Sequence, residues 1–277
     1  MKIPISVTCY NNDSEVLSFA KQVACFNRSE HYCFVVTCNS CVDKDELVKE
    51  LGNLSIETAC YDPGLNLGYL NGCLYGLQRY RQSNEFKWAI ICNTDITTEE
   101  GFFGKLLEVL SEEDAWCIGP DIILHSNKRK QNPFLVSRPR KSKLVKWSIA
   151  FSSYPLYSIY TGAHRIKSML CYRTVVKSAD WPTTRQKVYA LHGSFLICSS
   201  DCINNLYTEA KSLFMYEEEL LLAEIAHKLG KPVVFEPHLS VTHNENQVTG
   251  AVPSRKKFAW HSQSMAYLLR EYYHLWD

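Results

Sequence analysis

The sequence has no apolar run that approaches the roughly 20 residues of a membrane-spanning helix. Its first four residues, Met1 to Pro4, lead directly into a strand-like segment and show no signal-peptide pattern. We therefore expect a cytoplasmic protein that is soluble or that lies, at most, on the inner face of a membrane.

A strong excess of one charge is also missing. The chain has 30 Lys and Arg against 29 Asp and Glu, and this formal net charge of +1 gives no general sign of nucleic-acid binding. Hydrophobic residues make up 46% of the 277 residues and charged residues 21%, as in ordinary soluble proteins. No internal repeat or low-complexity linker divides the chain, which favours one large domain with an insertion.

The sequence also lacks a second cysteine pair at zinc spacing. Cys38 and Cys41 are spaced like half of a zinc or redox motif, but no similar pair follows them. The 12 cysteines are scattered, and several lie inside apolar runs, where a free thiol packs as a small hydrophobic group: Cys9, Cys33, Cys92 and Cys198. We therefore expect free thiols in a reducing compartment.

Short apolar runs alternate with helical patterns in the first half of the chain. Strands are predicted over 3–9, 34–38, 56–60 and 88–92, and helices from Asp13 or Ser14, over 46–51, and through Tyr75 and Leu77. This alternation predicts an α/β fold with a mixed, mainly parallel sheet and helices on both faces. Ligands bind such sheets at the carboxyl ends of the strands, a rule that brings together Tyr10, Asn11, Asn39 and Asp95.

Regular patterns return near residue 188. They predict a strand over 188–198, a helix over 217–229 that ends before Gly230 and Pro232, and short strands over 233–235 and 239–242. An aromatic-rich helix is expected to pass through Tyr267, Leu268, Tyr272 and Trp276.

The intervening segment is basic. Between Asp121 and Asp180 the chain carries 12 lysines and arginines and no acidic residue. These cations, which include Arg138, Arg140, Lys141 and Lys143, form either a solvated basic loop or a face for an anionic partner such as an anionic membrane. In the second case nearby aromatic side chains would settle at the headgroup level: Trp147, Phe151, Tyr154 and Tyr157.

Asp95 directly follows the fourth predicted strand. A carboxylate in this position can hold Mg²⁺ or Mn²⁺ against a diphosphate. The turn 93–95 can equally reverse the chain and cap a helix that begins near Thr98. Position alone does not decide between the two interpretations.

Three glutamates, Glu217, Glu218 and Glu219, open a predicted helix. One of them can serve as a general base, but acidic residues in a first helical turn are also favoured by the helix dipole. His243 ends a strand-like run, and a single histidine of this kind is more often structural than a ligand. Glycines in the segment 66–72 permit close approach to a ligand, and a plain turn explains them as well.

Taken in order, these segments resemble family-2 glycosyltransferases with the A-type, Rossmann-like fold, close to the rhamnosyl- and capsule-type enzymes. The resemblance covers roughly residues 3–250 and is carried by the segments 7–11, 66–72, 93–95, 192–195, 214–219 and 230–243. It implies a single transferase domain over 1–250, with a nucleotide-binding half (1–121), a basic and aromatic insertion (122–187) and an acceptor half (188–250). Residues 251–277 would form a helical tail.

The same resemblance implies an inverting enzyme of surface polysaccharide synthesis that moves a sugar from a nucleotide-diphosphate sugar to a glycan hydroxyl. Asp95 and His243 would hold Mn²⁺ or Mg²⁺, and Glu218 or Glu219 would be the catalytic base, with Glu218 slightly preferred. The acceptor would be a soluble or lipid-diphosphate-linked glycan rather than a nucleic acid. The nucleotide would contact Tyr10, Asn11, Asn39, Asn66, Gly68 and Asn93.

Two positions depart from the family pattern. Cys38 and Asn39 stand where the family usually has an Asp that contacts the base or ribose, which leaves Asp43 as a distant substitute. Asn93 replaces the first acid of the D-x-D motif and removes one charge from the metal site. A non-catalytic sugar- or nucleotide-binding protein and a nucleotidyltransferase remain alternatives, although the latter would need a Gly-rich basic loop after the first strand.

Overall fold

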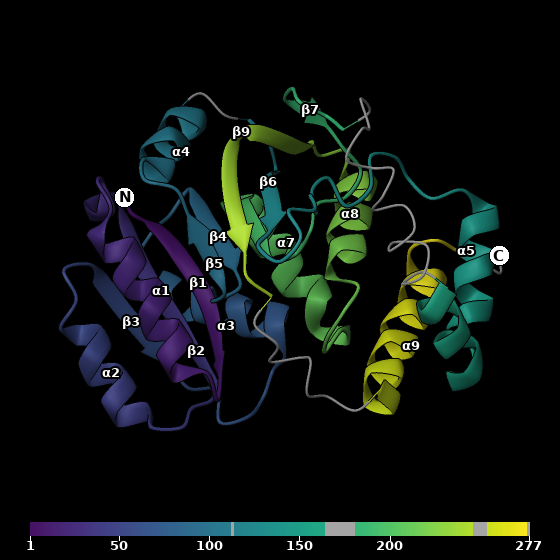
Figure 1. Cartoon of the computed structure of the whole chain (residues 1–277), viewed down its shortest axis with the longest axis horizontal. Coiled ribbons are helices and arrows are strands. Elements are labelled where there is room, and N and C mark those ends of the chain that lie inside the picture. The colour runs from purple at the N-terminus through teal and green to yellow at the C-terminus, as the bar shows by residue number, and fades with distance from the viewer. Residues whose placement is uncertain (112–113, 164–180, 246–253, 276–277) are drawn as a thin grey trace.

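The computed structural model describes residues 1–111, 114–163, 181–245 and 254–275. Within these ranges the strands form one nine-stranded mixed sheet across the molecule (Figure 1). Its strand order is β3-β2-β1-β4-β8-β6-β9-β5, and β7 pairs with β9. The strands are β1 (Ile3–Tyr10), β2 (Tyr32–Ser40), β3 (Glu57–Tyr61), β4 (Trp88–Cys92), β5 (Ile96–Thr98), β6 (Cys117–Leu124), β7 (Gln186–Lys187), β8 (Phe195–Ser199) and β9 (Val233–His243).

Six of these strands point the same way. β3, β2, β1 and β4 are mutually parallel neighbours, β8 is antiparallel to β4 and β6, and β9 runs parallel to β6. β5 and β7 are antiparallel to β9. The mixed, mainly parallel α/β sheet expected from the sequence is therefore confirmed.

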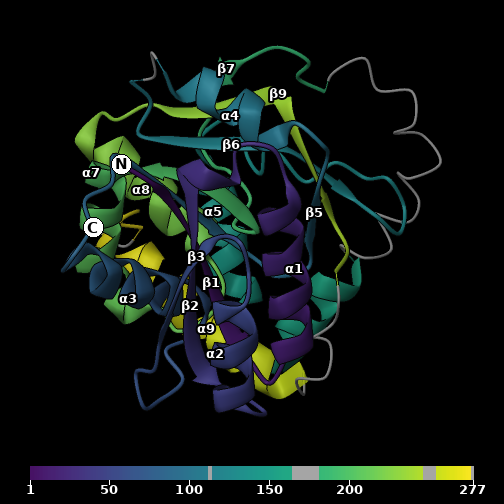
Figure 2. The ribbon, with the colours of Figure 1, turned by 90° about the vertical axis from the view of Figure 1, so that its left-hand side faces the viewer.

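Helices cover both faces of the sheet. They are α1 (Asp13–Cys25), α2 (Lys44–Gly52), α3 (Tyr69–Arg81), α4 (Phe102–Leu110), α5 (Lys141–Ala150), α7 (Ser200–Glu209), α8 (Glu218–Leu229) and α9 (Ser254–Glu271). Alternate strand residues enter two separate cores: Val35 and Ile91 pack with α3, α7, α8 and α9, whereas Phe34 and Ile90 pack with α1, α2 and α4. Figure 2 shows α1 and α3 on opposite sides of β1–β3.

Most of the predicted elements are present, and three predictions are wrong. The segment 188–198 is not one strand, because only Phe195–Ser199 pairs as β8. The two short strands predicted after Pro232 form the single strand β9, whose pairing with β6 is irregular beyond Pro120. No helix starts near Thr98, since β5 pairs with β9 and α4 begins only at Phe102.

The aromatic residues of the insertion belong to the interior. Trp147, Phe151 and Tyr157 are 8%, 9% and 8% exposed and pack with α9, which lies beside α5 (Figure 1). Tyr154 packs edge-on against Phe258 of α9. The expectation that these rings meet a membrane is therefore wrong for the three buried ones, which are used to dock α9.

Part of the positive charge of the insertion is neutralised within the molecule. The Lys130 Nζ lies 2.6 Å from the Asp121 carboxylate, and Arg138 pairs with the buried Glu224 of α8 at 2.8 Å. Residues 164–179 of the acid-free stretch, together with Asp180 and Trp276, lie outside the described residues. Among the helices that the structure describes, none has the length and apolar character to cross a membrane.

Candidate active site

Asp95 and His243 meet at one end of the sheet. Asp95 lies between β4 and β5, and the pairing of β5 with β9 sets Ile96 opposite His243. The His243 Nε2 lies 3.2 Å from the Asp95 Oδ1, and the two side chains are only 8% and 7% exposed. The Asn93 Nδ2 approaches the same Nε2 to 3.3 Å. Three polar groups of the predicted metal site thus converge.

A second contact orients the His243 ring. Its Nδ1 lies 2.8 Å from the Oε1 of Gln131, a carboxamide oxygen that only accepts hydrogen bonds. The Gln131 oxygen accepts the proton of Nδ1, and this contact turns Nε2 towards the Asp95 carboxylate and the Asn93 amide. A carboxylate oxygen and an imidazole nitrogen at this separation can share a cation, and support of a histidine through its other nitrogen is typical of metal ligands.

The segment 192–194 joins this pair to the start of α8. The backbone N–H of Asn93 donates to the Ser194 carbonyl at 3.0 Å, and the Gly193 N–H donates to the Glu219 Oε1 at 3.1 Å. The His192 ring has its centroid 6.1 Å from that of His243 and also interacts electrostatically with Glu219. Burial lowers the pKa of His192, so the ring is neutral at neutral pH.

The start of α8 is built on unusual backbone. Tyr216 and Glu217 both adopt the left-handed region, with φ of 68° and 66°, which costs free energy in residues other than glycine. The turn allows the Glu218 Oε1 to accept a hydrogen bond from the Tyr216 N–H at 2.9 Å. Glu217 points elsewhere, to the His261 Nδ1 at 3.0 Å.

The carboxyl group of Glu218 is strongly perturbed. Burial first, and then repulsion from Glu219, raise the pKa of Glu218 to about 8. Burial also raises the pKa of Glu217, against the effect of its contact with His261. Perturbed carboxyl groups gathered in this way are typical of functional sites.

The residues predicted to bind a nucleotide lie along the neighbouring strand ends. The Asn39 amide donates to the Gly68 carbonyl at 2.8 Å and accepts from the Leu67 N–H at 3.1 Å, so it fixes the loop 66–68. Asn66 accepts from the Gly68 N–H at 2.8 Å. Gly68 has a φ of 79°, and a Cβ there would overlap the carbonyl of Phe214, which explains why glycine is needed.

Tyr10 ends β1, and Asn11 begins the turn that follows it. The Tyr10 side chain is 45% exposed, and Asn11 has a φ of 56° while its Oδ1 accepts from the Ser40 hydroxyl at 2.7 Å. Next to this turn lies a cavity of about 310 Å³ lined by Cys38, Asn39, Ser40, Cys41, Lys44, Asp62, Gly64 and Leu65. The loop 66–68 thus lies between the cavity and the residues that precede α8.

Several site residues escaped the sequence analysis. Asp62 lines the cavity and pairs with the Lys44 Nζ at 2.8 Å, although the strand-end rule could have found it because it follows β3. Asp43, the distant substitute for the family's Asp, instead caps α2 by accepting from the Glu46 N–H at 3.0 Å. Gln131 gave no signal, since it reaches His243 from a loop 112 residues away in the sequence.

No protein-family model matches the chain, and no curated protein matches it significantly in sequence. Solved structures do match it. GalNAc-T7 with UDP, GalNAc and Mn²⁺ has a TM-score of 0.58 at 12% identity, over 91% of this chain and 45% of that one. The mannosyltransferase PcManGT from Pyrobaculum calidifontis, in complex with GDP-Man and Mn²⁺, has a TM-score of 0.54 at 11% identity, over 98% and 64%.

S. aureus TarS 1-349 in complex with UDP-GlcNAc has a TM-score of 0.58 at 12% identity, over 99% of this chain and 69% of that one. The chain therefore spans less than half of the matched GalNAc-T7 and about two thirds of the other two. Similarity at this level of identity establishes the fold, which is that of the A-type glycosyltransferases.

Proposed function

We propose that this protein is an inverting, metal-dependent glycosyltransferase that moves a sugar from a nucleotide-diphosphate sugar to a glycan hydroxyl in polysaccharide synthesis. The observation that carries the proposal is the approach of Asp95 and His243 to Glu218 and Glu219 across the segment 192–194. This arrangement, on a fold whose solved neighbours hold UDP, GDP-Man or UDP-GlcNAc, supports our proposal of a metal site beside a catalytic base.

Asp95 and His243 are the residues that would hold the cation. Their oxygen and nitrogen atoms suit Mn²⁺ or Mg²⁺, and two of the solved relatives contain Mn²⁺. When bound, such an ion offsets the negative charge that develops on the leaving diphosphate. Asn93 would add a neutral donor. The proposed site of the nucleoside is the cavity beside Asn39 and Asp62. The side-chain oxygens of these two residues can accept hydrogen bonds from the hydroxyl and base N–H groups of a nucleoside.

Glu218 is our preferred base. A general base works best when its pKa lies near the working pH, and the pKa of about 8 for Glu218 meets this condition. In the proposed step the acceptor oxygen attacks the anomeric carbon, the carboxylate takes the acceptor proton, and the bond to the diphosphate breaks. A single displacement inverts the configuration. Glu219, which already accepts from the Gly193 N–H, would hold the segment 192–194 beside the reacting groups.

A panel of nucleotide sugars with Mn²⁺, scored by thermal shift and then by transfer, tests the proposal. One donor should stabilise the wild-type chain, by about 2.7 kcal/mol at a ligand concentration 100 times Kd. Asp95→Asn should lose this Mn²⁺-dependent shift and slow transfer by about 100-fold or more, as expected when charge stabilisation is removed. Asp45→Asn, in the first turn of α2, is the matched control and should behave as wild type.

Three outcomes would count against the proposal. Full transfer by Asp95→Asn in EDTA would exclude the metal role. Donor binding with neither transfer nor hydrolysis, followed by mass spectrometry, would indicate a non-catalytic binding protein. Retention of the donor's anomeric configuration in the product, followed by NMR, would exclude the single displacement.

A further inference from the structure

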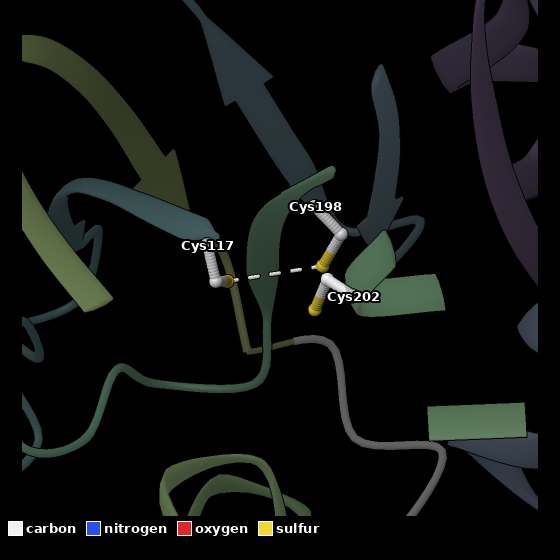
Figure 3. Close-up of side chains that lie close together, drawn as sticks. All are labelled: Cys117, Cys198 and Cys202. Atoms are coloured by element: carbon white, nitrogen blue, oxygen red, sulfur yellow. Dashed lines mark hydrogen bonds between the residues drawn. The ribbon is translucent and has the colours of Figure 1, made fainter. Parts of the chain in front are cut away.

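Two groups of side chains in the described ranges place three possible metal ligands within 4.8 Å of one another. The first comprises Cys117, Cys198 and Cys202, from β6, β8 and α7 (Figure 3). Its Cys117 and Cys198 Sγ atoms are 3.8 Å apart, and all three residues are fully buried in an apolar core. Packing as small hydrophobic groups accounts for them.

The second group is different in composition and position. It comprises Cys9 at the end of β1, Asp13 at the start of α1, and Cys41 just beyond β2. The Cys9 thiol donates to the Asp13 Oδ1 at 3.2 Å. Asp13 and Cys41 are only partly buried, so an ion can reach the group from solvent.

A further thiol, that of Cys38, adjoins this group. Parallel pairing of β1 with β2 sets Cys38 directly opposite Cys9. The Cys38 Sγ lies 3.3 Å from that of Cys60, and Cys38 and Cys9 each also interact electrostatically with the Cys41 thiol. The sequence shows no second cysteine pair to complete a metal site with Cys38 and Cys41. The fold brings Cys9 and Asp13 to them instead, and these two residues precede the pair in the chain and are not themselves a spaced cysteine pair.

We propose that Cys9, Asp13 and Cys41 form a binding site for a thiophilic divalent cation of the Zn²⁺ class, with Cys38 as the fourth donor once its thiol turns away from Cys60. Three sulfurs and one carboxylate oxygen are a tetrahedral donor set of the kind that zinc accepts. Sulfurs bonded to one zinc at about 2.3 Å lie nearly 4 Å apart, so the ligand atoms of Cys9, Asp13 and Cys41, which lie within 4.8 Å of one another, need little contraction to bind it. Its thiolate ligands make this site chemically different from the one at Asp95 and His243, whose oxygen and nitrogen ligands suit harder ions.

Proton release accompanies binding. Burial, with the Cys38 contact, raises the pKa of Cys41 to about 12, so this thiol is neutral without metal. As three metal–sulfur bonds form, three S–H bonds break and three protons pass to solvent. Asp13 needs no deprotonation. Although burial opposes it, hydrogen bonds from the N–H groups of Asp43 and Val42 lower the pKa of Asp13.

Occupancy would stiffen the nucleotide side of the molecule. The donors tie the turn after β1 to the end of β2, and Cys38 and Cys41 line the 310 Å³ cavity. A metal here would therefore bind the folded state alone and raise the melting temperature. This consequence does not depend on the proposed transferase activity.

Titration of the reduced, metal-free full chain with Cd²⁺ tests the site, because Cd²⁺–thiolate bonds absorb in the near ultraviolet. We expect one Cd²⁺ per chain, a thiolate band, and a rise in melting temperature that a chelator reverses. Cys41→Ser and Cys38→Ser should weaken binding by about 100-fold or more, since even residues behind a ligand contribute 10–100-fold. Circular dichroism checks that both variants are folded.

Three control variants locate the metal. Cys25→Ser, at an exposed cysteine outside both groups, and Asp95→Asn should leave the band unchanged. Cys202→Ser should also leave it unchanged. Absence of a thiolate band in the wild type, an undiminished band in both Cys41→Ser and Cys38→Ser, or loss of the band in Cys202→Ser alone would each overturn the proposal.

Discussion

At the scale of single residues, adjacent carboxyl groups acquire different chemistry from their surroundings. Glu219 accepts a hydrogen bond from the Gly193 N–H, whereas Glu218, half-buried beside Glu219, accepts one from the Tyr216 N–H. With a pKa of about 8, most Glu218 side chains hold a proton in the folded chain at neutral pH, chiefly because burial penalises the charged form. The ionised fraction, which is the form that acts as a base, grows as the pH rises towards 8. Two neighbours of one type can therefore divide the roles of base and positioning residue.

Glu218→Gln should reduce turnover and leave donor affinity nearly unchanged. The amide keeps the shape of the side chain but cannot accept a proton, so an interaction used only in the transition state is lost. Removal of a general base typically costs about 10²–10⁴-fold in rate. Steady-state kinetics with the donor identified above measures the effect. An active Glu218→Gln beside an inactive Glu219→Gln would move the base to Glu219.

The pH dependence of stability provides the control for this assignment. Because the folded pKa of Glu218 lies above its usual 4.5, the folded chain retains a proton that the unfolded chain releases. The contribution of Glu218 to stability is therefore complete below about pH 4.5 and is lost as the pH rises to about 8. Thermal melts across this window should show a smaller fall in Glu218→Gln than in the wild type. An equal fall in stability in the two proteins would mean that Glu218 is ionised in the folded chain throughout this pH range.

At the scale of elements, one polar network fastens the insertion to the acceptor side. Arg138 donates to both Glu224 oxygens of α8 at 2.8 Å, and Glu224 also accepts from the Tyr189 hydroxyl. That hydroxyl lies 2.6 Å from the hydroxyl of Tyr273, just beyond α9. The network connects a loop, two helices and the segment before β8.

Arg138→Gln should lower the free energy of unfolding by about 1–3 kcal/mol, because the 3% exposed Glu224 loses its charged partner. The Arg138 side chain is 41% exposed, so the loss should stay below that of a fully buried pair. Denaturant unfolding measures it. Arg140→Gln, at an exposed neighbouring cation, is the matched control. Equal stability of the two variants would show that the pair contributes nothing.

The sequence predicted elements better than their contacts. Strands with unbroken apolar runs, such as β4, were located to the residue, and Gly230 ends α8 with the expected φ of 64°. The interruption before β8 was missed because it depends on Gly193 bonding to Glu219 and on His192 bonding to Asn132, partners distant in sequence. Periodicity reports burial along an element, and it carries no information on which distant group satisfies a backbone N–H.

At the scale of the whole molecule, the segments that resemble the transferases are brought to one end of the sheet by its topology. Insertion of β8 between β4 and β6 sets the segment 192–194 against Asn93, and the return of β9 beside β5 brings His243 to Asp95. Motif order predicted the fold because several motifs lie at the ends of strands: 93–95 follows β4, 192–195 leads into β8, and 230–243 contains β9. The aromatic residues of the insertion were misjudged because their hydrophobicity serves the docking of α9 equally well.

The insertion has further exposed cations, and we propose that they contact an anionic membrane. Once Lys130 and Arg138 are set aside as internally paired, exposed cations remain at the start of α5 and along it, including Arg140, Lys141 and Lys146. Two apolar side chains nearby, Ile149 and Ile159, are 54% and 68% exposed. A lipid-diphosphate-linked glycan acceptor would be reached from such a surface, and we extend the proposed function to it.

We expect the full chain to sediment with anionic vesicles at low salt and not with neutral ones. The attraction should fall with added salt, because each cation near the surface contributes roughly 1 kcal/mol that ions screen. Replacing Arg140, Lys141 and Lys146 with Gln should weaken binding by about 100-fold, the equivalent of roughly 3 kcal/mol. The matched control replaces three exposed lysines elsewhere, Lys87, Lys105 and Lys228, and should bind as the wild type does. Equal, negligible binding of the wild type to both vesicles would instead indicate a soluble acceptor.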